Sequence, residues 1–132
     1  MNRWFAAAAA VSLVLTAAHI IGGTPEFLTP ILQSDLGTDI RAVAGIVWHG
    51  VSVLLIVNSA VLIAAAMNRP AGRQGAIWVI LQYLGFTGLF LFYGITWLGN
   101  VGDLPQWTIL AVISALTLAG LRSGRRAVGA VS

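Results

Sequence analysis

Four stretches of this chain lack any charged side chain, and their length limits the possible folds more than any other feature of the sequence. The stretches are residues 4–21, 42–66, 76–98 and 107–121. The first three reach the roughly 17–25 residues that an α-helix needs to cross about 30 Å of hydrocarbon. The fourth is shorter, but the long side chain of Arg122 can reach back to the interface and extend it. The pattern predicts four transmembrane helices.

The composition agrees with a membrane location. Hydrophobic residues make up 58% of the 132 residues and charged residues only 8%, so a water-soluble fold would lack polar side chains to cover its surface. We expect an all-α fold, a four-transmembrane-helix bundle formed by a single domain over residues 1–122. Residues 123–132 are small and basic. They predict a cytoplasmic tail whose arginines meet anionic lipid head groups.

The charged residues are divided unevenly between the two sides of the predicted bundle. The acidic residues all fall in the loops of one side, together with a single arginine, Arg41; they are Glu26, Asp35, Asp39 and Asp103. The other six arginines flank the chain ends and the loop between the second and third spans; they are Arg3, Arg69, Arg73, Arg122, Arg125 and Arg126. By the positive-inside rule both termini lie in the cytoplasm. We expect a multi-pass protein of a bacterial inner membrane.

Tryptophans at the ends of the spans agree with this orientation. Trp4 and Trp78 lie at the predicted inner interface, and Trp97 and Trp107 lie at the outer one. An indole at an interface keeps its ring in lipid and its N–H near water. The aromatic belt and the arginines therefore predict the same topology.

Two alternative interpretations of the basic and apolar segments are weaker. The first span resembles a cleaved signal peptide in its Arg3 and its small residues at 16–18, but about 18 apolar residues exceed the about 7–15 of a signal-peptide core. A basic composition is also typical of nucleic-acid-binding proteins, yet seven cationic residues in short membrane-flanking segments do not form a binding groove. The absence of cysteine excludes disulfides, thiolate metal sites and iron–sulfur ligation.

The loop between the first two spans, residues 22–38, is the longest and the most patterned. Gly22 and Gly23 are expected to end the first helix, since glycine readily adopts the left-handed conformation that closes a C-terminus. The Thr-Pro pairs at 24–25 and 29–30 each predict a helix start. Apolar residues recur between them at near-helical spacing, so we expect a short amphipathic surface helix. It is either a packing lid or a gate over an outer-leaflet cavity, with Glu26 facing inward.

The only two histidines lie inside the apolar spans, where a polar group costs free energy unless it finds a partner. Both are predicted to lie in the outer leaflet, and each belongs to a helix face of small or hydroxylic residues that suits helix contact. These faces are Ser12, Thr16 and His19 in the first span, and Gly45, His49, Ser52, Ile56 and Ser59 in the second. We expect a binding site formed by His19, His49, Ser52, Tyr93 and Glu26.

Three interpretations of this cluster stay open at the level of the sequence. Two imidazoles on neighbouring helices can be axial ligands of a haem b or, with Glu26, ligands of a metal ion. The same residues can line a pocket for an organic or lipid-like ligand. Both histidines, His19 and His49, can also be neutral and hydrogen-bonded, so that they only hold the helices together. No His-Glu-x-x-His or Glu-x-x-His motif supports the metal interpretation further.

The second and third spans carry a further polar pair and an aromatic face. Asn58 and Gln82 both lie about two turns from the cytoplasmic ends of their helices, so we expect an interhelical hydrogen bond worth about 1 kcal/mol. The third span also places glycines between aromatic residues, which suits tight helix packing or a flat apolar molecule. One face of this span comprises Gln82, Phe86, Leu89, Tyr93 and Trp97.

These features favour a small, non-enzymatic membrane protein that binds a partner protein, another copy of itself or an apolar ligand in its outer-leaflet half. A redox subunit with haem or metal at His19 and His49 is the first alternative. A minimal transporter is the second. Chain length and span count are similar to those of small multidrug exporters, but such exporters are expected to hold a carboxylate within a span, and here every carboxylate lies in a loop. An enzyme has least support, because no nucleophile–base pair or phosphate-binding loop is recognisable.

Overall fold

The structure, a computed structural model, describes the backbone of residues 1–129 and the side chains of residues 1–123. All regular secondary structure within these residues is helical, which confirms the all-α class. Most side chains of the predicted tail, residues 123–132, lie outside the described part of the chain. The elements are α1 (Arg3–Ala17), the π-helix η1 (Ala18–Leu28), α2 (Thr29–Leu32), α3 (Thr38–Ala66), α4 (Pro70–Trp97) and α5 (Gln106–Gly129).

Among the described residues, three helices are long and apolar enough to cross a membrane: Arg3–Leu32 with 30 residues, α3 with 29 and α4 with 28. The fourth predicted span, 107–121, lies within α5. Local chemistry sets where the helices begin. The Asn2 side chain accepts a hydrogen bond from the backbone N–H of Trp4 at 3.0 Å and caps α1, and Pro70 occupies the first turn of α4, where its missing N–H costs no hydrogen bond.

The predicted end of the first helix at Gly22 and Gly23 is wrong, because the helix continues through η1 and α2 to Leu32. Glycine ends a helix through a positive φ, and among the described glycines only Gly99 has one. The chain turns at residues 33–37 instead, where Arg41 donates from Nη1 to the Leu32 carbonyl at 3.1 Å. The predicted surface helix is therefore the last part of the first helix.

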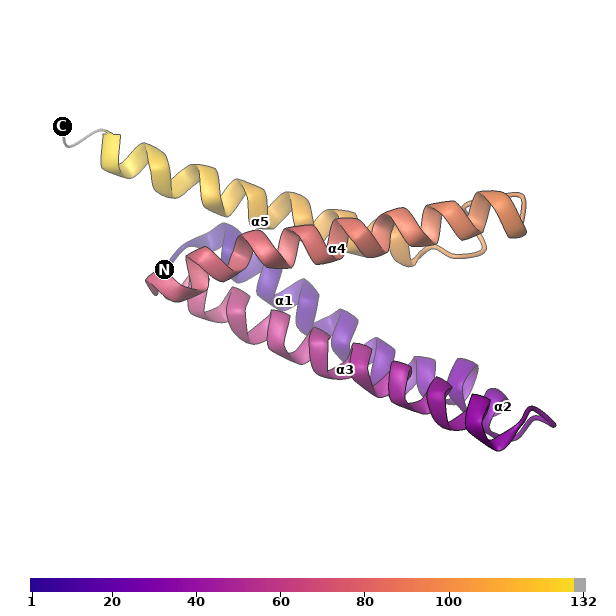
Figure 1. Ribbon diagram of the computed structural model, residues 1–132. Helices are drawn as coiled ribbons and strands as arrows, with labels where there is room; N and C mark the ends of the chain where they lie inside the picture. The colour runs from indigo at the N-terminus through magenta and orange to yellow at the C-terminus, as the bar shows by residue number, and fades with distance from the viewer. Residues whose placement is uncertain (130–132) are drawn as a thin grey trace.

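The long helices run alternately up and down and form two hairpins. α1 packs beside α3 and α5, and α4 packs beside the same two helices. Figure 1 shows that the α1–α3 hairpin and the α4–α5 hairpin lie together near the N-terminus and diverge towards the other end. We call the end with Asn2 and the α3–α4 turn the closed end. The end with residues 33–37 and 98–105 is the open end.

Polar contacts join the helices at the closed end. The backbone N–H of Asn2 donates to the Ala66 carbonyl on α3 at 2.8 Å, and its side-chain Nδ2 donates to Ser123 Oγ on α5 at 3.0 Å. On α4, Arg73 donates from Nη2 to the Leu121 carbonyl of α5 at 2.7 Å. Each bond satisfies a backbone or side-chain group that would otherwise be unpaired near apolar surface. The start of α1, the end of α3, the first turns of α4 and the last part of α5 are thus tied together.

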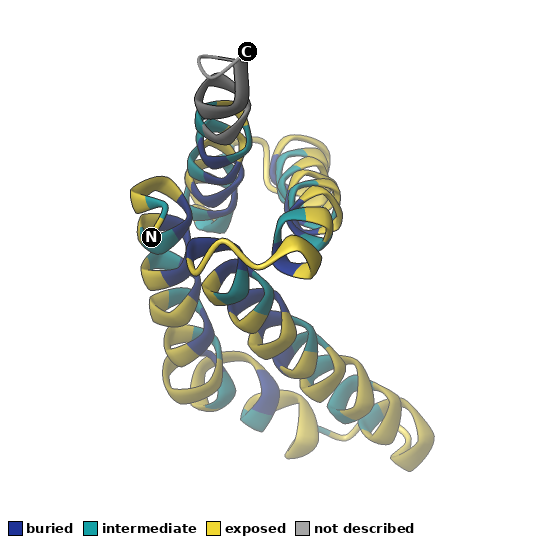
Figure 2. Ribbon diagram, turned by 90° about the vertical axis from the view of Figure 1, so that its left-hand side faces the viewer, coloured by how far each residue is buried: buried dark blue, intermediate teal, exposed yellow. Residues whose placement is uncertain are grey.

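The hydrophobic core lies between the four helices on the closed side of the molecule. Figure 2 shows the buried positions on the helix faces that turn towards one another and the exposed positions outside. Small residues dominate the α1 and α3 contributions, which lets the helices approach closely. The core comprises Phe5, Ala8 and Ala9 of α1; Leu55, Leu62, Ala65 and Ala66 of α3; Ala76, Val79 and Tyr83 of α4; and Leu110 and Ile113 of α5.

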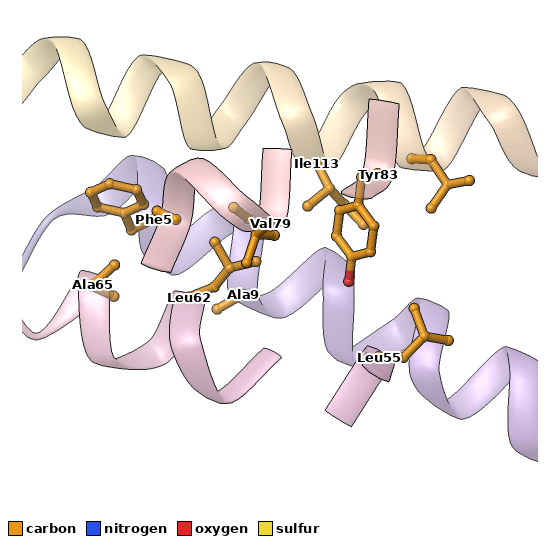
Figure 3. Packing of buried hydrophobic residues seen from close by; sticks show 12 residues of the cluster. Phe5, Ala9, Leu55, Leu62, Ala65, Val79, Tyr83 and Ile113 are labelled. Atoms are coloured by element: carbon orange, nitrogen blue, oxygen red, sulfur yellow. The ribbon is translucent and has the colours of Figure 1, made fainter. Parts of the chain in front are cut away.

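A chain of hydrogen-bonded, buried hydroxyl groups lies in the middle of the bundle. Ser59 Oγ donates to the Leu55 carbonyl at 2.9 Å, so it accepts from Ser12 Oγ, which lies 2.8 Å away. Ser12 in turn accepts from the Tyr83 hydroxyl at 2.9 Å. Figure 3 shows the Tyr83 ring beside Ile113 with its hydroxyl pointing away from α5. This hydroxyl clamp joins α1, α3 and α4 at the level where the hairpins begin to separate.

The outer surface of the described chain is strongly apolar. Large side chains are more than half exposed along the helices; they include Val14, Ile46, Val53, Trp78 and Ile95. Water-soluble monomers rarely expose continuous apolar surface of this extent. The surface, together with three helices of sufficient length, fits a membrane protein.

Candidate functional site at the open end

His19 packs directly against the second helix of its own hairpin. Its ring stacks on the Trp48 indole with centroids 4.1 Å apart and planes 19° apart. Its Nε2 lies 3.3 Å from the Trp48 carbonyl oxygen, which can only accept, so this nitrogen carries the proton. The same carbonyl accepts from Ser52 Oγ at 3.1 Å. His19 and Ser52, both predicted site residues, thus meet at one backbone oxygen.

The π-helix shapes its surface to fit Trp48. Because π-helical hydrogen bonds run from i to i+5, residues four and five apart lie on one side, which brings Gly23 and Thr24 below His19. Thr24 Oγ1 accepts from the indole Nε1 of Trp48 at 3.2 Å. A Cβ on Gly23 would lie 2.9 Å from the Trp48 ring, so only glycine leaves room for it. Pro25 lacks the N–H of a regular helical ladder and favours this local departure from α-geometry.

The remaining residues of the predicted cluster lie elsewhere. His49 follows Trp48, and its side chain is exposed rather than turned towards His19. Glu26 on η1 is also exposed, which gives no support to the gate with an inward-facing Glu26. Tyr93 belongs to α4, in the hairpin that diverges from the one carrying His19 (Figure 1). The structure therefore brings two of the five residues together and separates the other three from them.

This geometry gives the haem and metal interpretations little support. Within the described residues, no group of three or more His, Asp or Glu side chains is placed to hold a metal ion. His19 Nε2 is already engaged with the Trp48 carbonyl. His49 and Glu26 are exposed on separate helices. A pair or triad of ligands built from these residues would require His19 to leave Trp48.

Trp48 is the residue of this site that the sequence analysis missed. Four of the five tryptophans lie at predicted interfaces, whereas Trp48 falls inside the second span. A tryptophan within a span has an N–H that must find a hydrogen-bond partner. This requirement indicates that Trp48 faces another helix rather than lipid. The seam of α3 facing α1 runs through Trp48, Ser52 and Ser59, so His49 lies about 100° away from it.

The α3–α4 contact changes along its length from small to large residues. At the closed end, a Cβ on Gly72 would overlap backbone atoms of Ala64 and Ala65, and one on Gly75 would lie 2.8 Å from Val61. The two helices are therefore in backbone contact at Gly72, and at Gly75 only the Val61 side chain lies between them. Further along, the amide side chains of Asn58 and Gln82 bridge the gap, with Asn58 Nδ2 donating to Gln82 Oε1 at 3.3 Å. This is the hydrogen bond that the sequence led us to expect.

Beyond the amide pair, the same face of α4 carries large apolar residues. They line an open groove of about 310 Å³ formed by Phe86, Leu89, Phe90, Tyr93 and Leu104. Three of these belong to the face predicted from the helical spacing of α4. Tyr93 also packs edge-on against Trp97, with ring centroids 5.2 Å apart. The groove offers apolar contact and aromatic faces, and Tyr93 is the one lining residue that carries a polar side-chain group.

Comparison of the chain with protein-family models, with curated proteins and with solved structures finds no match.

Proposed function

We propose that the chain is a four-span integral membrane protein with both termini in the cytoplasm, as in a bacterial inner membrane. Three apolar helices of sufficient length and the antiparallel α5 support four crossings. The closed end carries Arg3, Arg69, Arg73 and Arg122, and the open end carries the four acidic residues. Single cysteines at Ser34 and Asn68 test this topology in cells. An impermeant maleimide should label the first and not the second, and labelling of both from one side would contradict four crossings.

We further propose that the protein binds an apolar, chain-like ligand of the lipid class in the groove of its α4–α5 hairpin at the open end, without catalysing a reaction on it. The observation that carries this proposal is the groove on α4 that begins where the α3–α4 packing ends. From Phe86 to Tyr93 the groove runs along seven residues of α4, or roughly 10 Å at about 1.5 Å per residue. This length fits within one leaflet, which is about half of an apolar core about 30 Å thick.

The chemistry of the groove favours a hydrocarbon chain over a polar ligand. Its lining residues are aromatic or aliphatic, and a polar ligand group placed there would lose its hydrogen bonds to water without replacement. Ligand pockets of about 300 Å³ are at the small end of the usual range. A single flexible chain fits such a groove better than a folded partner domain, which would need a much larger interface.

A photoactivatable palmitic acid probe with a diazirine near the end of its chain tests the proposal. Irradiation of the purified protein in nanodiscs should place adducts on peptides that contain residues 86–93 and 104. Leu89→Trp, which fills the groove, should lower labelling about tenfold, equivalent to about 1.4 kcal/mol of binding free energy. Leu84→Trp is the matched control, because Leu84 is exposed on α4 outside the groove. Equal labelling of the two variants would refute a ligand site in the groove.

A further inference from the structure

The closed end gathers positive charge from separate parts of the chain. Asn2 joins the start of α1 to the end of α3 and to Ser123 on α5. The neighbours of these contacts are cationic: Arg3 follows Asn2, Arg122 precedes Ser123, and Arg69 lies in the turn that leaves α3. The acidic residues, in contrast, belong to the segments at the open end. The described part of the closed end therefore carries uncompensated positive charge.

The guanidinium groups at this end differ in whether they are held by contacts within the protein or exposed. Arg73 is fixed by its bond to the Leu121 carbonyl. Arg3 lies over the Trp4 ring, with Cζ 5.4 Å from the ring centroid, so its stem follows apolar surface. Arg69 and Arg122 are exposed. At least two guanidinium groups thus point outward with their hydrogen-bond donors available.

Apolar surface begins directly beside these charges. Trp4 is 37% exposed, Met67 48% and Trp78 67%. A ligand that contacts both the arginines and this apolar surface must present a negative group next to hydrocarbon. Guanidinium groups bind phosphate through short, often bidentate, charge-assisted hydrogen bonds, and a free anion would leave the apolar zone uncovered.

We propose that the closed end is a binding surface for the head groups of anionic phospholipids, and that lipid bound there stabilises the junction of the four helices. This inference rests on the membrane placement proposed above but not on the groove. A phosphate bridging arginines of different helices adds a link where Asn2 and Arg73 already join them. The charge of an anionic leaflet attracts each arginine, and salt weakens the attraction.

Thermal unfolding in nanodiscs tests the proposal. Discs of phosphatidylcholine are compared with discs containing phosphatidylglycerol with the same acyl chains, so the groove meets identical chains in both. We expect phosphatidylglycerol to raise the unfolding temperature by about 5 °C, and high salt to remove most of this gain. Native mass spectrometry from mixed micelles should show phosphatidylglycerol retained in preference to phosphatidylcholine.

Two variants and one control locate the effect. Arg69→Gln with Arg122→Gln should lose most of the gain, and each single change about half of it. Arg41→Gln, at the open end, should keep the full gain whatever its own stability. Inorganic phosphate added to phosphatidylcholine discs should give no shift. An equal unfolding temperature in both lipids, a full gain in the double variant, or the same shift from free phosphate would each overturn the proposal.

Discussion

The closed and open ends of this molecule use the same pair of helices in opposite ways. At the closed end, α4 meets α3 through Gly72, which lies against the backbone of Ala64 and Ala65, and through Gly75, which lies against the Val61 side chain. At the open end, the same face of α4 presents Phe86, Leu89 and Tyr93 to a groove. Since packed helices move apart as their side chains grow, the increase in residue size along one helix face explains why the hairpins diverge.

The two ends also differ in what holds them together. The closed end and the middle of the bundle are stabilised between hairpins, by the bond from Asn2 to Ser123 and by the hydroxyl clamp of Tyr83, Ser12 and Ser59. At the open end each hairpin is stabilised within itself, by His19 on Trp48 in one and by the Trp107 Nε1 bond to the Val101 carbonyl, at 3.1 Å, in the other. The contacts between hairpins are thus concentrated away from the open end.

The largest expected effect is at the closest backbone approach. Gly72→Ala puts a Cβ onto the backbone of Ala64 and Ala65, which cannot move aside as a side chain could. We expect a loss of about 3 kcal/mol in the free energy of unfolding, measured by denaturation in detergent. The matched change Gly85→Ala, on the same helix with open space around its Cβ, should alter stability by less than about 0.5 kcal/mol. Similar losses of stability in both variants would contradict the close contact of Gly72 with the α3 backbone.

A smaller effect is expected where the open end is held within one hairpin. Gly23→Ala places a methyl group 2.9 Å from the Trp48 ring and should cost about 1 kcal/mol, because the stacked ring must shift away from His19. Gly22→Ala, one residue earlier, has no atom within 4 Å of its Cβ and should be neutral or slightly stabilising. Thermal unfolding of the two variants distinguishes them. If Gly22→Ala were the more destabilising change, Gly23 would not be the residue of η1 that faces Trp48.

The smallest effect lies at the boundary between the two ends. Asn58→Leu and Gln82→Leu each remove one partner of the interhelical hydrogen bond. A double-mutant cycle should give a coupling energy of about 0.6–1 kcal/mol, the usual size for polar pairs between membrane helices. Additive single effects would mean that this pair does not contribute to the junction of α3 and α4.

Much of the fold could be predicted from the sequence because apolar length and arginine placement act over whole helices. The predicted spans 42–66 and 76–98 lie within or close to α3 and α4. The pairing of Asn58 with Gln82 followed from equal depth, and the aromatic face of α4 from helical spacing. These inferences need only a rise of about 1.5 Å and a turn of about 3.6 residues.

The errors concern local winding and rotation about a helix axis. The first helix was expected to end at Gly22, but π-helical winding carries it through both glycines and Pro25. His49 was expected on the seam that Trp48 occupies. A shift of one residue turns a side chain by about 100°, and spacing alone did not distinguish a seam of small residues from one that includes a large ring with a hydrogen-bonding N–H.

Spin-label distances between α3 and α4 measure the divergence of the two hairpins directly. The chain has no cysteine, so labels can be introduced without background. The helices are antiparallel and Asn58 is level with Gln82, so Val47 (58 − 11) is level with Tyr93 (82 + 11), both exposed at the open end. Ile63 (58 + 5) and Ile77 (82 − 5), also both exposed, form the matching pair at the closed end. We expect a clearly longer distance for Val47→Cys with Tyr93→Cys than for Ile63→Cys with Ile77→Cys. Equal distances would mean that α3 and α4 keep a constant separation along their whole length, and would contradict the divergence of the hairpins.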